Sequence, residues 1–231
     1  MTTVGVVQFP GTNCELDVQR AVEHLGGAAE ILWHADATVG AVDAVVVPGG
    51  FAHGDYLRTG AIARFSPVMQ AIAEFAAGGG PVVGICNGFQ VLTEAGLLPG
   101  ALQKNAGLTF ICDTIELRVE SADSVLTNRC APGDILRVPI NHFEGNYVCD
   151  GPTLERLRAD ERIVFRYVRN PNGSVDDIAG ICSEGRNVVG LMPHPERASD
   201  LLLGSADGVP LLESLLAAAG RPADVDRALA G

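Results

Sequence analysis

Basic residues are scarce in this sequence. Lysine and arginine together number 16 among 231 residues, against 28 aspartates and glutamates, and the formal net charge is -12 at pH 7. Binding to nucleic acid or to an anionic membrane surface normally uses a basic surface that neutralises phosphates or headgroups. The charge balance therefore argues against nucleic acid and against anionic membranes as partners.

Long apolar runs are also missing. No stretch approaches the roughly 20 apolar residues that a helix needs to span a bilayer. No basic segment precedes an apolar one near Met1, so the sequence shows no sign of a signal peptide. We therefore expect a cytoplasmic protein that does not bind membranes.

Paired cysteine motifs and phosphate-binding loops are absent as well. No C-x-x-C occurs, and the cysteine spacings do not indicate a zinc site, so we expect no metal. No G-x-x-x-x-G-K-[ST] loop occurs, so we expect no nucleotide or other cofactor bound by this chain. In a reducing compartment, cysteines outside a motif are most simply small buried hydrophobic residues. The six cysteines are Cys14, Cys86, Cys112, Cys130, Cys149 and Cys182.

Aromatic residues make up only 5% of the sequence, whereas hydrophobic residues make up 47%. Alanine, valine, leucine and glycine supply most of this content, which is typical of a valine-rich parallel sheet flanked by helices of small residues. The length allows a substantial core within one domain. We interpret residues 1–231 as a single domain, with a polar, alanine-rich tail at 221–231 that is loosely ordered or adds a helical turn.

Strand and helix patterns alternate through the first part of the chain. This alternation predicts an α/β fold with a doubly wound, mostly parallel sheet and right-handed crossovers. In such sheets the functional site lies at the carboxyl ends of the strands. We expect strands at 3–9, 29–33, 42–47 and 81–85, a helix capped by Asn13 that ends near Leu25, and helices at 59–77 and from the end of the fourth strand to about Ala95.

The middle of the chain has short strand patterns with little helix between them. We interpret it as an added region of strands, partly joined to the sheet and partly in an antiparallel hairpin. The expected strands lie at 111–119, 124–129, 135–140 and 163–169, followed by strands at 178–182 and 187–192 and a closing helix at 209–219.

Residues 84–88 read Gly-Ile-Cys-Asn-Gly between an apolar strand and a helical pattern. This G-x-C-x-G is the thiol counterpart of the G-x-S-x-G nucleophile elbow, a turn so sharp that only small residues fit at Gly84 and Gly88. The turn places Cys86 at a helix N-terminus, where the helix dipole favours the reactive thiolate. The backbone N–H of Asn87, the next residue, is a natural donor to an oxyanion.

Far downstream, residues 192–196 read Met-Pro-His-Pro-Glu. His194 supplies a base, and Glu196 lies two residues on, where an extended segment projects it to the same side. With Cys86 these residues form a candidate Cys-His-Glu catalytic triad.

In these motifs the chain resembles the class I (triad) glutamine amidotransferases, which have a flavodoxin-like fold. Within that class it is similar to the glutaminase subunits of phosphoribosylformylglycinamidine synthase, an enzyme of purine biosynthesis. The resemblance extends over roughly residues 3–218. The matching stretches are Pro48–Phe51, Gly54–Arg58, Gly60–Arg64, Gly84–Leu92, Asp177–Ile181 and Gly190–Glu196.

The resemblance implies roles for further residues. It assigns the second oxyanion donor to the N–H of Gly50, and glutamine binding to Gly49 and Gln90. The Asn141-His142-Phe143 stretch looks like part of the loop that contacts the α-amino and carboxylate ends of glutamine. Phe143 stands where the family commonly has glycine, and a phenylalanine does not easily adopt positive φ, which puts backbone contacts at this position in question.

The resemblance also implies partners. L-glutamine is the substrate, a synthetase subunit uses ATP and Mg²⁺ and receives the ammonia, and a small accessory subunit bridges the two. We expect Asp55, Arg58 and Arg64 either to face the synthetase or to form a salt-bridged surface cluster. Docking at this segment, next to Gly50, would couple glutamine hydrolysis to the readiness of the acceptor.

Three other interpretations remain open at this level. The DJ-1-like cysteine hydrolases and chaperone-like proteins also place a cysteine elbow on a doubly wound sheet, but they do not need a C-terminal His-Pro-Glu. A non-catalytic subunit could retain the fold without the activity. A glutaminase could also serve another acceptor, as in imidazole glycerol phosphate or anthranilate synthesis.

Overall fold

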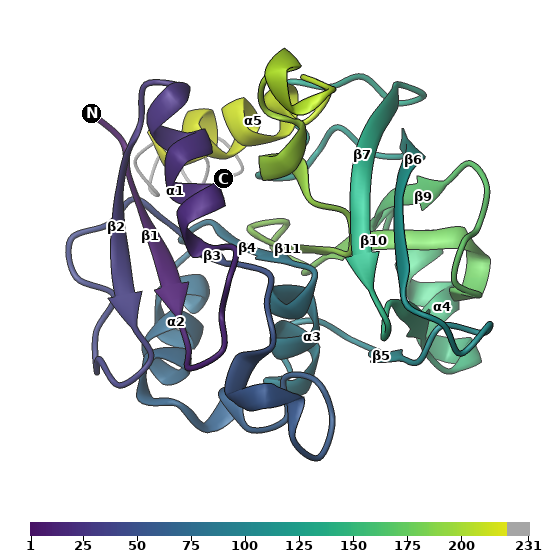
Figure 1. Cartoon of the computed structure of the whole chain (residues 1–231), viewed down its shortest axis with the longest axis horizontal. Helices are drawn as coiled ribbons and strands as arrows, with labels where there is room; N and C mark the ends of the chain where they lie inside the picture. The colour runs from purple at the N-terminus through teal and green to yellow at the C-terminus, as the bar shows by residue number, and fades with distance from the viewer. Residues whose placement is uncertain (221–231) are drawn as a thin grey trace, which may run out of the picture.

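Nine strands form one mixed sheet with helices on both faces, in a computed structural model that describes residues 1–220 (Figure 1). The predicted tail at 221–231 lies outside the described residues. In spatial order the strands are β2 (Ala28–Trp33), β1 (Thr3–Gln8), β3 (Ala44–Val47), β4 (Val82–Ile85), β11 (Val188–Leu191), β10 (Ile178–Cys182), β9 (Ile163–Tyr167), β6 (Ile111–Val119) and β7 (Ile135–His142).

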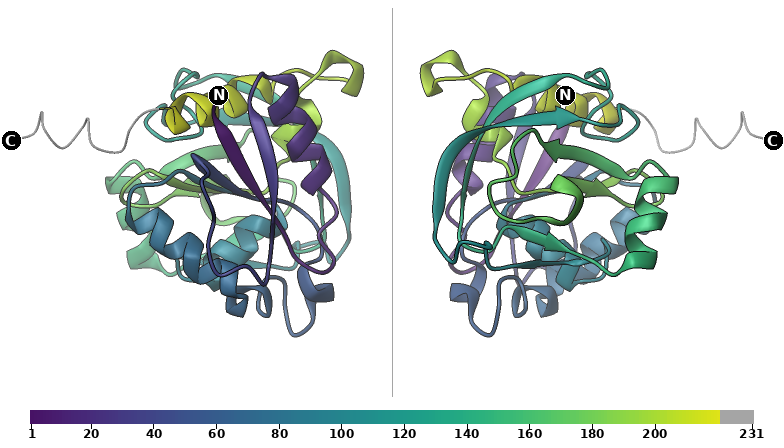
Figure 2. Two further views of the ribbon diagram at one scale, coloured as in Figure 1. Left: turned by 90° about the vertical axis from the view of Figure 1, so that its left-hand side faces the viewer. Right: turned by 90° about the vertical axis from the view of Figure 1, so that its right-hand side faces the viewer.

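The first five strands of this order pair in parallel, in the 2-1-3-4-5 order of flavodoxin-like sheets. β3, β4 and β11 are buried along their whole length, which explains their continuous runs of valine and other apolar residues. Helices α1 (Glu15–His24) and α5 (Val209–Ala219) cover one face, and α2 (Pro67–Ala77) and α3 (Asn87–Glu94) cover the other (Figures 1 and 2). The predicted doubly wound α/β fold is confirmed.

The remaining four strands extend the sheet in antiparallel pairs from β11 through β10, β9 and β6 to β7. β6 and β7 form a long hairpin at the sheet edge, and β7 alternates between exposed or half-buried and buried residues, as expected where one face meets solvent. The predicted antiparallel region is therefore part of the same sheet. The short strands β5 (Ala101–Gln103) and β8 (Asn146–Val148) pair separately.

The predicted helix at 59–77 is wrong in its first half. Residues 59–62 form turns, a single 3₁₀ turn, η2, covers Ala63–Phe65, and the α-helix begins only at Pro67. Ser66 has φ -66° and ψ 140°. A proline disfavours the helical conformation of the residue before it, so the helical pattern in the sequence breaks here.

Two other local predictions are also wrong. Residues 124–129 form consecutive turns instead of a strand, held by the Ser124 and Thr127 hydroxyls, which lie 2.7 Å apart. Helix α1 is capped by Cys14 instead of Asn13. Helix α4 (Gly151–Ala159) was not predicted, although Asp150, whose carboxylate accepts a hydrogen bond from the N–H of Thr153, is a typical N-cap.

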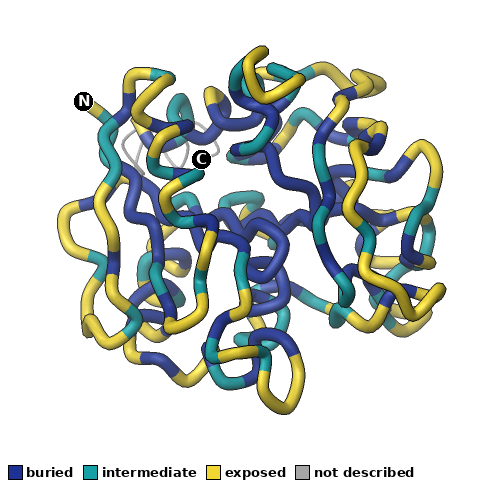
Figure 3. Tube along the Cα trace, viewed as in Figure 1, coloured by how far each residue is buried: buried dark blue, intermediate teal, exposed yellow. Residues whose placement is uncertain are grey.

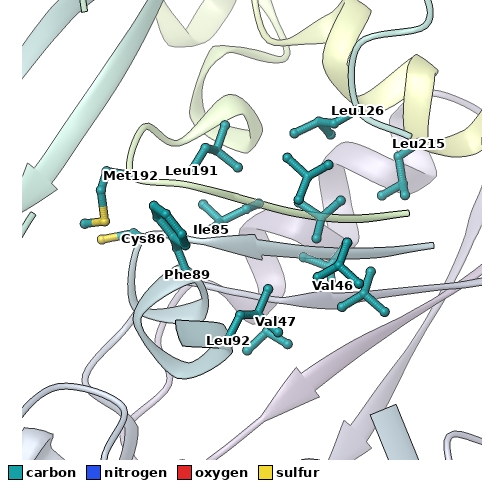
Figure 4. Packing of buried hydrophobic residues seen from close by; sticks show 14 of the residues in the cluster. Val46, Val47, Ile85, Cys86, Phe89, Leu92, Leu126, Leu191, Met192 and Leu215 are labelled. Atoms are coloured by element: carbon teal, nitrogen blue, oxygen red, sulfur yellow. The ribbon is translucent and has the colours of Figure 1, made fainter. Parts of the chain in front are cut away.

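Buried residues concentrate in the central strands, and exposed ones in the outer loops (Figure 3). In the close view, Cys86 lies at one end of this packed cluster, next to Ile85 and Phe89 (Figure 4). Cys86 is therefore attached directly to the buried core of the sheet. Within residues 1–220, no helix has the length and apolarity required to cross a membrane.

Candidate active site

The cysteine elbow lies between β4 and α3. Cys86 has φ 52° and ψ -106°, a conformation that side chains other than glycine rarely adopt. A Cβ at Gly88 would run into the carbonyl oxygen of Val47, and one at Gly84 would come within 2.6 Å of the Leu92 side chain. Small residues are therefore required on both sides of the strained cysteine, as the sequence predicted.

His194 and Glu196 lie just beyond β11, which pairs in parallel with β4, so both arms of the site leave the sheet at the same edge. His194 Nδ1 lies 2.6 Å from Glu196 Oε1, and both side chains are buried. His194 Nε2 is buried without a hydrogen-bond partner in the described part of the chain. Glu196 therefore orients the imidazole so that Nε2 is available to Cys86.

The charge state of His194 depends on its neighbours. Burial alone would lower the pKa of His194, but the Glu196 carboxylate and the sulfurs of Cys86 and Cys14 outweigh it and raise this pKa well above its ordinary value. An imidazolium, able to give a proton to a leaving group, is thus favoured at neutral pH.

A second thiol lies beside the triad. Cys14 Sγ accepts a hydrogen bond of 3.1 Å from Arg197 Nη2, and a Cβ at Gly49 would come within 3.1 Å of the same sulfur and 2.8 Å of the His194 ring. Gly49 thus permits close packing of the loop after β3 against the triad. Cys14 is buried as predicted, but this hydrogen bond makes it more than a small hydrophobic residue. The prediction of burial is wrong for Cys112, which is exposed.

Donor atoms of Cys14, His194 and Glu196 all lie within 4.8 Å of one another, as the ligands of a metal would. The guanidinium of Arg197, hydrogen-bonded to Cys14, already supplies a positive charge at this point. A metal cation there would be repelled by this charge and would compete with the His194–Glu196 hydrogen bond. The arrangement fits a polar network better than a metal centre.

The two expected oxyanion donors flank Cys86. Asn87 is the first residue of α3, where an N–H has no intrahelical acceptor. Gly50 has φ +150° and pairs with Thr12 in an isolated bridge, and a Cβ there would come within 2.7 Å of the Thr12 Cα. Only glycine therefore fits at this position, which leaves its backbone accessible at the pocket.

Gly50, Cys86 and His194 line a cavity of about 250 Å³. Its walls come from the loops after β1, β3, β4, β7 and β11, and Cys86, Gln90, Asn141 and Glu144 are among the residues that line it. The Cys86 thiol lies 3.7 Å from the carbonyl oxygen of Asn141. Two larger hollows, of about 970 and 1100 Å³, are open and lie at the amino ends of β4 and β11, away from the triad. The smaller cavity is therefore the candidate site.

The loop after β7 is held in place by hydrogen bonds with Asn105. His142 is buried with Nδ1 3.1 Å from Asn105 Oδ1, and burial together with the charge on His194 lowers the pKa of His142 to about 4. The His142 side chain is neutral at physiological pH.

Phe143 does not have positive φ, and its carbonyl accepts a hydrogen bond from the N–H of Asn105. The replacement of glycine at this position therefore imposes no backbone strain.

The three residues expected at a partner interface separate into two groups. Arg58 forms two hydrogen bonds with the Glu94 carboxylate, at 2.5 and 2.6 Å, and Arg64 Nη1 donates to the Glu94 carbonyl oxygen. Together they form a salt-bridged cluster at the surface. Asp55 instead lines the cavity and accepts a hydrogen bond from Asn87 Nδ2 at 3.2 Å.

Asp55 has an unusual charge environment. Burial, followed by the nearby negative charge of Glu144, raises the pKa of Asp55 to about 6, although the hydrogen bond from Asn87 partly opposes this shift. The folded chain therefore holds a proton on Asp55 that the unfolded chain, with a value near 3.8, releases. Ionised Asp55 consequently destabilises the fold.

We expect Asp55→Asn to raise Tm at pH 8. An asparagine keeps an oxygen that can accept from Asn87 but carries no charge. Because the folded pKa lies above the unfolded pKa, the destabilisation is complete above pH 6 and disappears as the pH falls towards 4. The difference in Tm between variant and wild type, measured by calorimetry, should shrink over that window. A difference that does not change between pH 4 and 8 would contradict this assignment.

Several pocket residues had no recognisable signal in the sequence. Arg197 directly follows the His-Pro-Glu motif, and Cys14 follows the first strand in a loop that ends at the same sheet edge. That shared edge is the one clue that could have located Cys14. Asn105, between β5 and β6, holds the loop after β7 in place, and no sequence motif marks it.

Comparison with protein families places this geometry among known proteins. A model of the CobB/CobQ-like glutamine amidotransferase domain matches residues 1–206. The chain is 61% identical to the phosphoribosylformylglycinamidine synthase subunit PurQ of Rubrobacter xylanophilus, over 94% of this chain and 98% of that protein. It is 55% identical to the PurQ subunit of Koribacter versatilis, over 93% and 97% of the two chains.

Solved structures agree with these similarities. A chain in the structure of PurLQS from Thermotoga maritima superimposes with a TM-score of 0.87 at 40% identity, covering 94% of this chain and 98% of that one. A putative GMP synthase subunit from Thermoplasma acidophilum superimposes with a TM-score of 0.68 at 15% identity, covering 95% and 94%, and shows a shared fold alone.

Proposed function

The chain belongs to the CobB/CobQ-like glutamine amidotransferase family and, within it, to the PurQ subunits of phosphoribosylformylglycinamidine synthase, and on this premise we propose how its residues release ammonia from glutamine. It is the glutaminase subunit of that synthase. The observation that supports the mechanism best is the buried His194–Glu196 pair with Nε2 left unpartnered in the cavity that Cys86 lines.

The first half of the reaction forms a thioester. The thiol proton is already carried by the His194 imidazolium, the form that its raised pKa favours, and the Cys86 sulfur attacks the amide carbon of glutamine as a thiolate. The C–N bond of the tetrahedral intermediate then breaks, and the imidazolium gives its proton to the departing nitrogen, which leaves as ammonia. Glu196 accepts a hydrogen bond from Nδ1 throughout and stabilises the imidazolium.

The second half releases glutamate. His194 removes a proton from a water molecule as the water attacks the thioester carbon, and the C–S bond breaks to return the Cys86 thiol. In both halves the oxyanion lies between the N–H groups of Gly50 and Asn87, where losing one donor typically costs about 100- to 1,000-fold in rate. Glutamine lies in the cavity with its amide towards Cys86, against Gln90 and the loop that contains Asn141, His142 and Phe143. Gly49 contributes by packing against His194 beside the cavity.

The partners are a PurL-type synthetase subunit and a PurS-type accessory subunit, as in the PurLQS complex. The surface next to the cavity is suited to the synthetase. Phe51, Tyr56, Leu57 and Phe65 are half to nine-tenths exposed, and Phe51 also lines the cavity. Exposed apolar groups of this kind mark interaction sites. Arg58 and Arg64 lie on the same segment and provide a charged part of the proposed interface.

Membership of this family also supports the proposed cofactor use, acceptor substrate and cellular compartment. The chain acts as one catalytic domain and binds no cofactor, whereas the synthetase subunit uses ATP and Mg²⁺ to activate formylglycinamide ribonucleotide. The ammonia converts that substrate to formylglycinamidine ribonucleotide. The complex works in the cytoplasm, where the thiol of Cys86 stays reduced.

Glutamate release by the purified chain tests the proposal, with and without the synthetase and accessory subunits of the same organism, ATP, Mg²⁺ and formylglycinamide ribonucleotide. We expect the complete mixture to release glutamate much faster than the chain alone. Cys86→Ala should remove this activity. Cys130→Ala, which removes a thiol away from the cavity, should keep the activity and is the control for Cys86→Ala. If the complete mixture gives no increase, the assignment to this acceptor is wrong.

A further inference from the structure

The side chain of Asn87 links three separate segments of the site. Its Oδ1 accepts a hydrogen bond of 3.0 Å from the N–H of Ala52, in the loop after β3. Its Nδ2 donates to Asp55 Oδ1 at 3.2 Å and to Gln90 Oε1 at 2.9 Å. Gln90 Nε2 in turn donates to the carbonyl oxygen of Glu144, in the loop after β7.

This network uses every polar group of the amide. Asn87 is only 2% exposed, so both of its N–H groups and its oxygen need partners inside the protein. One oxygen acceptor and two donors, directed at three partners, match an amide. A serine has a single donor, and an aspartate has none when ionised. The chemistry of this position therefore requires asparagine.

The network also connects the two proposed donors of the oxyanion hole. Ala52 lies two residues after Gly50, and Asn87 itself provides the other proposed donor through its backbone. The bond from Ala52 to the Asn87 side chain therefore fixes the loop of one donor against the residue of the other. Gly50 has a positive φ in a loop that follows the sheet, and a bond of this kind restricts how far that loop can move.

Gln90 is fixed in the same way. Both ends of its amide are occupied, by Asn87 and by Glu144, and its side chain is 4% exposed. Through Gln90 the network reaches the loop of Asn141 to Gly145, against which glutamine lies. A single side chain thus connects the nucleophile, the oxyanion loop and the glutamine loop.

We propose that the side chain of Asn87 is a positioning residue that holds the Gly50 loop at the distance from Cys86 that oxyanion binding requires, with Asp55 as its hydrogen-bond partner. This inference rests on the proposed glutaminase mechanism. In this proposal Asp55 acts only as a hydrogen-bond acceptor for Asn87, and this role does not require the negative charge of Asp55. The exposed Tyr56 and Leu57 follow Asp55 directly, so a partner that binds them also acts on this hydrogen bond.

Exchanging the side chains of Asn87 and Asp55 tests the proposal. In Asn87→Asp, the new carboxylate faces the Asp55 carboxylate and the Gln90 amide oxygen, so both hydrogen bonds donated by Nδ2 are lost. We expect kcat to fall about 100-fold, because displacement of a catalytic group by about 1 Å has an effect of this size. Asp55→Asn alone keeps an acceptor for Nδ2, so its loss of kcat should be at least about tenfold smaller than that of Asn87→Asp. In the double variant, the new amide at position 55 can donate to the new carboxylate at position 87, and at least about tenfold of the lost kcat should return.

The measurements are kcat and KM for glutamine in the assembled complex. Asn187→Asp is the control, since Asn187 also loses two amide hydrogen bonds, to Ala76 and Gly80, at the opposite end of β11. It should lower Tm without lowering kcat. The Tm of each variant is measured as well: a low kcat in an Asn87→Asp enzyme that is fully folded at the assay temperature distinguishes positioning from a general loss of stability.

Three results would overturn the proposal. One is an Asn87→Asp enzyme with wild-type kcat. The second is an Asp55→Asn enzyme as impaired as Asn87→Asp, since the charge of Asp55 would then be the important feature. The third is a double variant with no recovery. A Cys86→Ala sample in the same assay separates this inference from the proposed function. If wild type also shows no Cys86-dependent release of glutamate, the mechanism itself has failed.

Discussion

Cys86→Ala should abolish release of glutamate, with a loss in kcat on the order of 10⁶-fold, as for other residues of a catalytic triad. The thioester forms on this sulfur, because Cys86 is the thiol at the elbow and lines the cavity with His194, whereas the Cys14 sulfur in the same cavity is hydrogen-bonded to Arg197. Glutamate release should be measured in the assembled complex. The synthetase should still use free ammonia, since its own site is untouched.

The strained backbone at Cys86 also leads to a prediction about stability. Cys86→Gly should be as inactive as Cys86→Ala but more stable than it by about 1 kcal/mol, because glycine adopts positive φ without the strain that any Cβ imposes. Chemical denaturation of both variants measures this difference directly. Alanine is the matched control, since it also removes the sulfur. If alanine were the more stable variant, the backbone at residue 86 would not be strained.

Glu196→Gln should lower kcat by about 10⁴-fold while leaving KM for glutamine nearly unchanged. A glutamine cannot accept the proton of Nδ1 as strongly, and its amide can present a donor that favours the wrong tautomer of His194. The DJ-1-like hydrolases do not use a carboxylate in this place, so the loss also discriminates between the two mechanisms. Full activity of Glu196→Gln would contradict the triad.

The same variant has a pH signature. Without the negative charge of Glu196, burial dominates and the pKa of His194 falls, so the residual activity should extend less far into alkaline pH. In the wild type the raised pKa means that this pair stabilises the fold fully below about pH 6.5, and that the stabilisation is lost as pH rises through the raised value. The Tm difference between wild type and Glu196→Gln should therefore be larger near pH 6 than at alkaline pH. Glu184→Gln is a suitable control, because Glu184 is an exposed carboxylate paired with the buried Arg162.

Most of the fold could be predicted because its signals are local. The valine runs of β3, β4 and β11 and the alternation with helices determine a parallel sheet, and the glycines at 84 and 88 mark the elbow. The errors occurred where one residue overrides a longer pattern. Pro67 ends the helical conformation at Ser66, and hydroxyl hydrogen bonds at Ser124 favour turns in an apolar segment.

The members of the candidate triad could be identified in the sequence for a different reason. Cys86 and His194 belong to short motifs whose chemistry is readable at their own positions, and the shared edge of the sheet brings them together. The supporting residues have no such motifs. Cys14, Asn105 and the side-chain role of Asn87 depend on which loops meet in space, and neighbouring residues in the sequence carry no information about that.

The order of the strands also affects when activity can appear during synthesis of the chain. β4 and β11 are neighbours in the sheet, yet the whole antiparallel region lies between them in the sequence. A nascent chain that has emerged through α3 already carries its nucleophile but lacks the base, the carboxylate and the strand that aligns them. Because pairing of such distant strands is late in folding, glutamine cannot be hydrolysed by an incomplete chain. The cell thus loses no glutamine to unfinished or truncated copies of the enzyme.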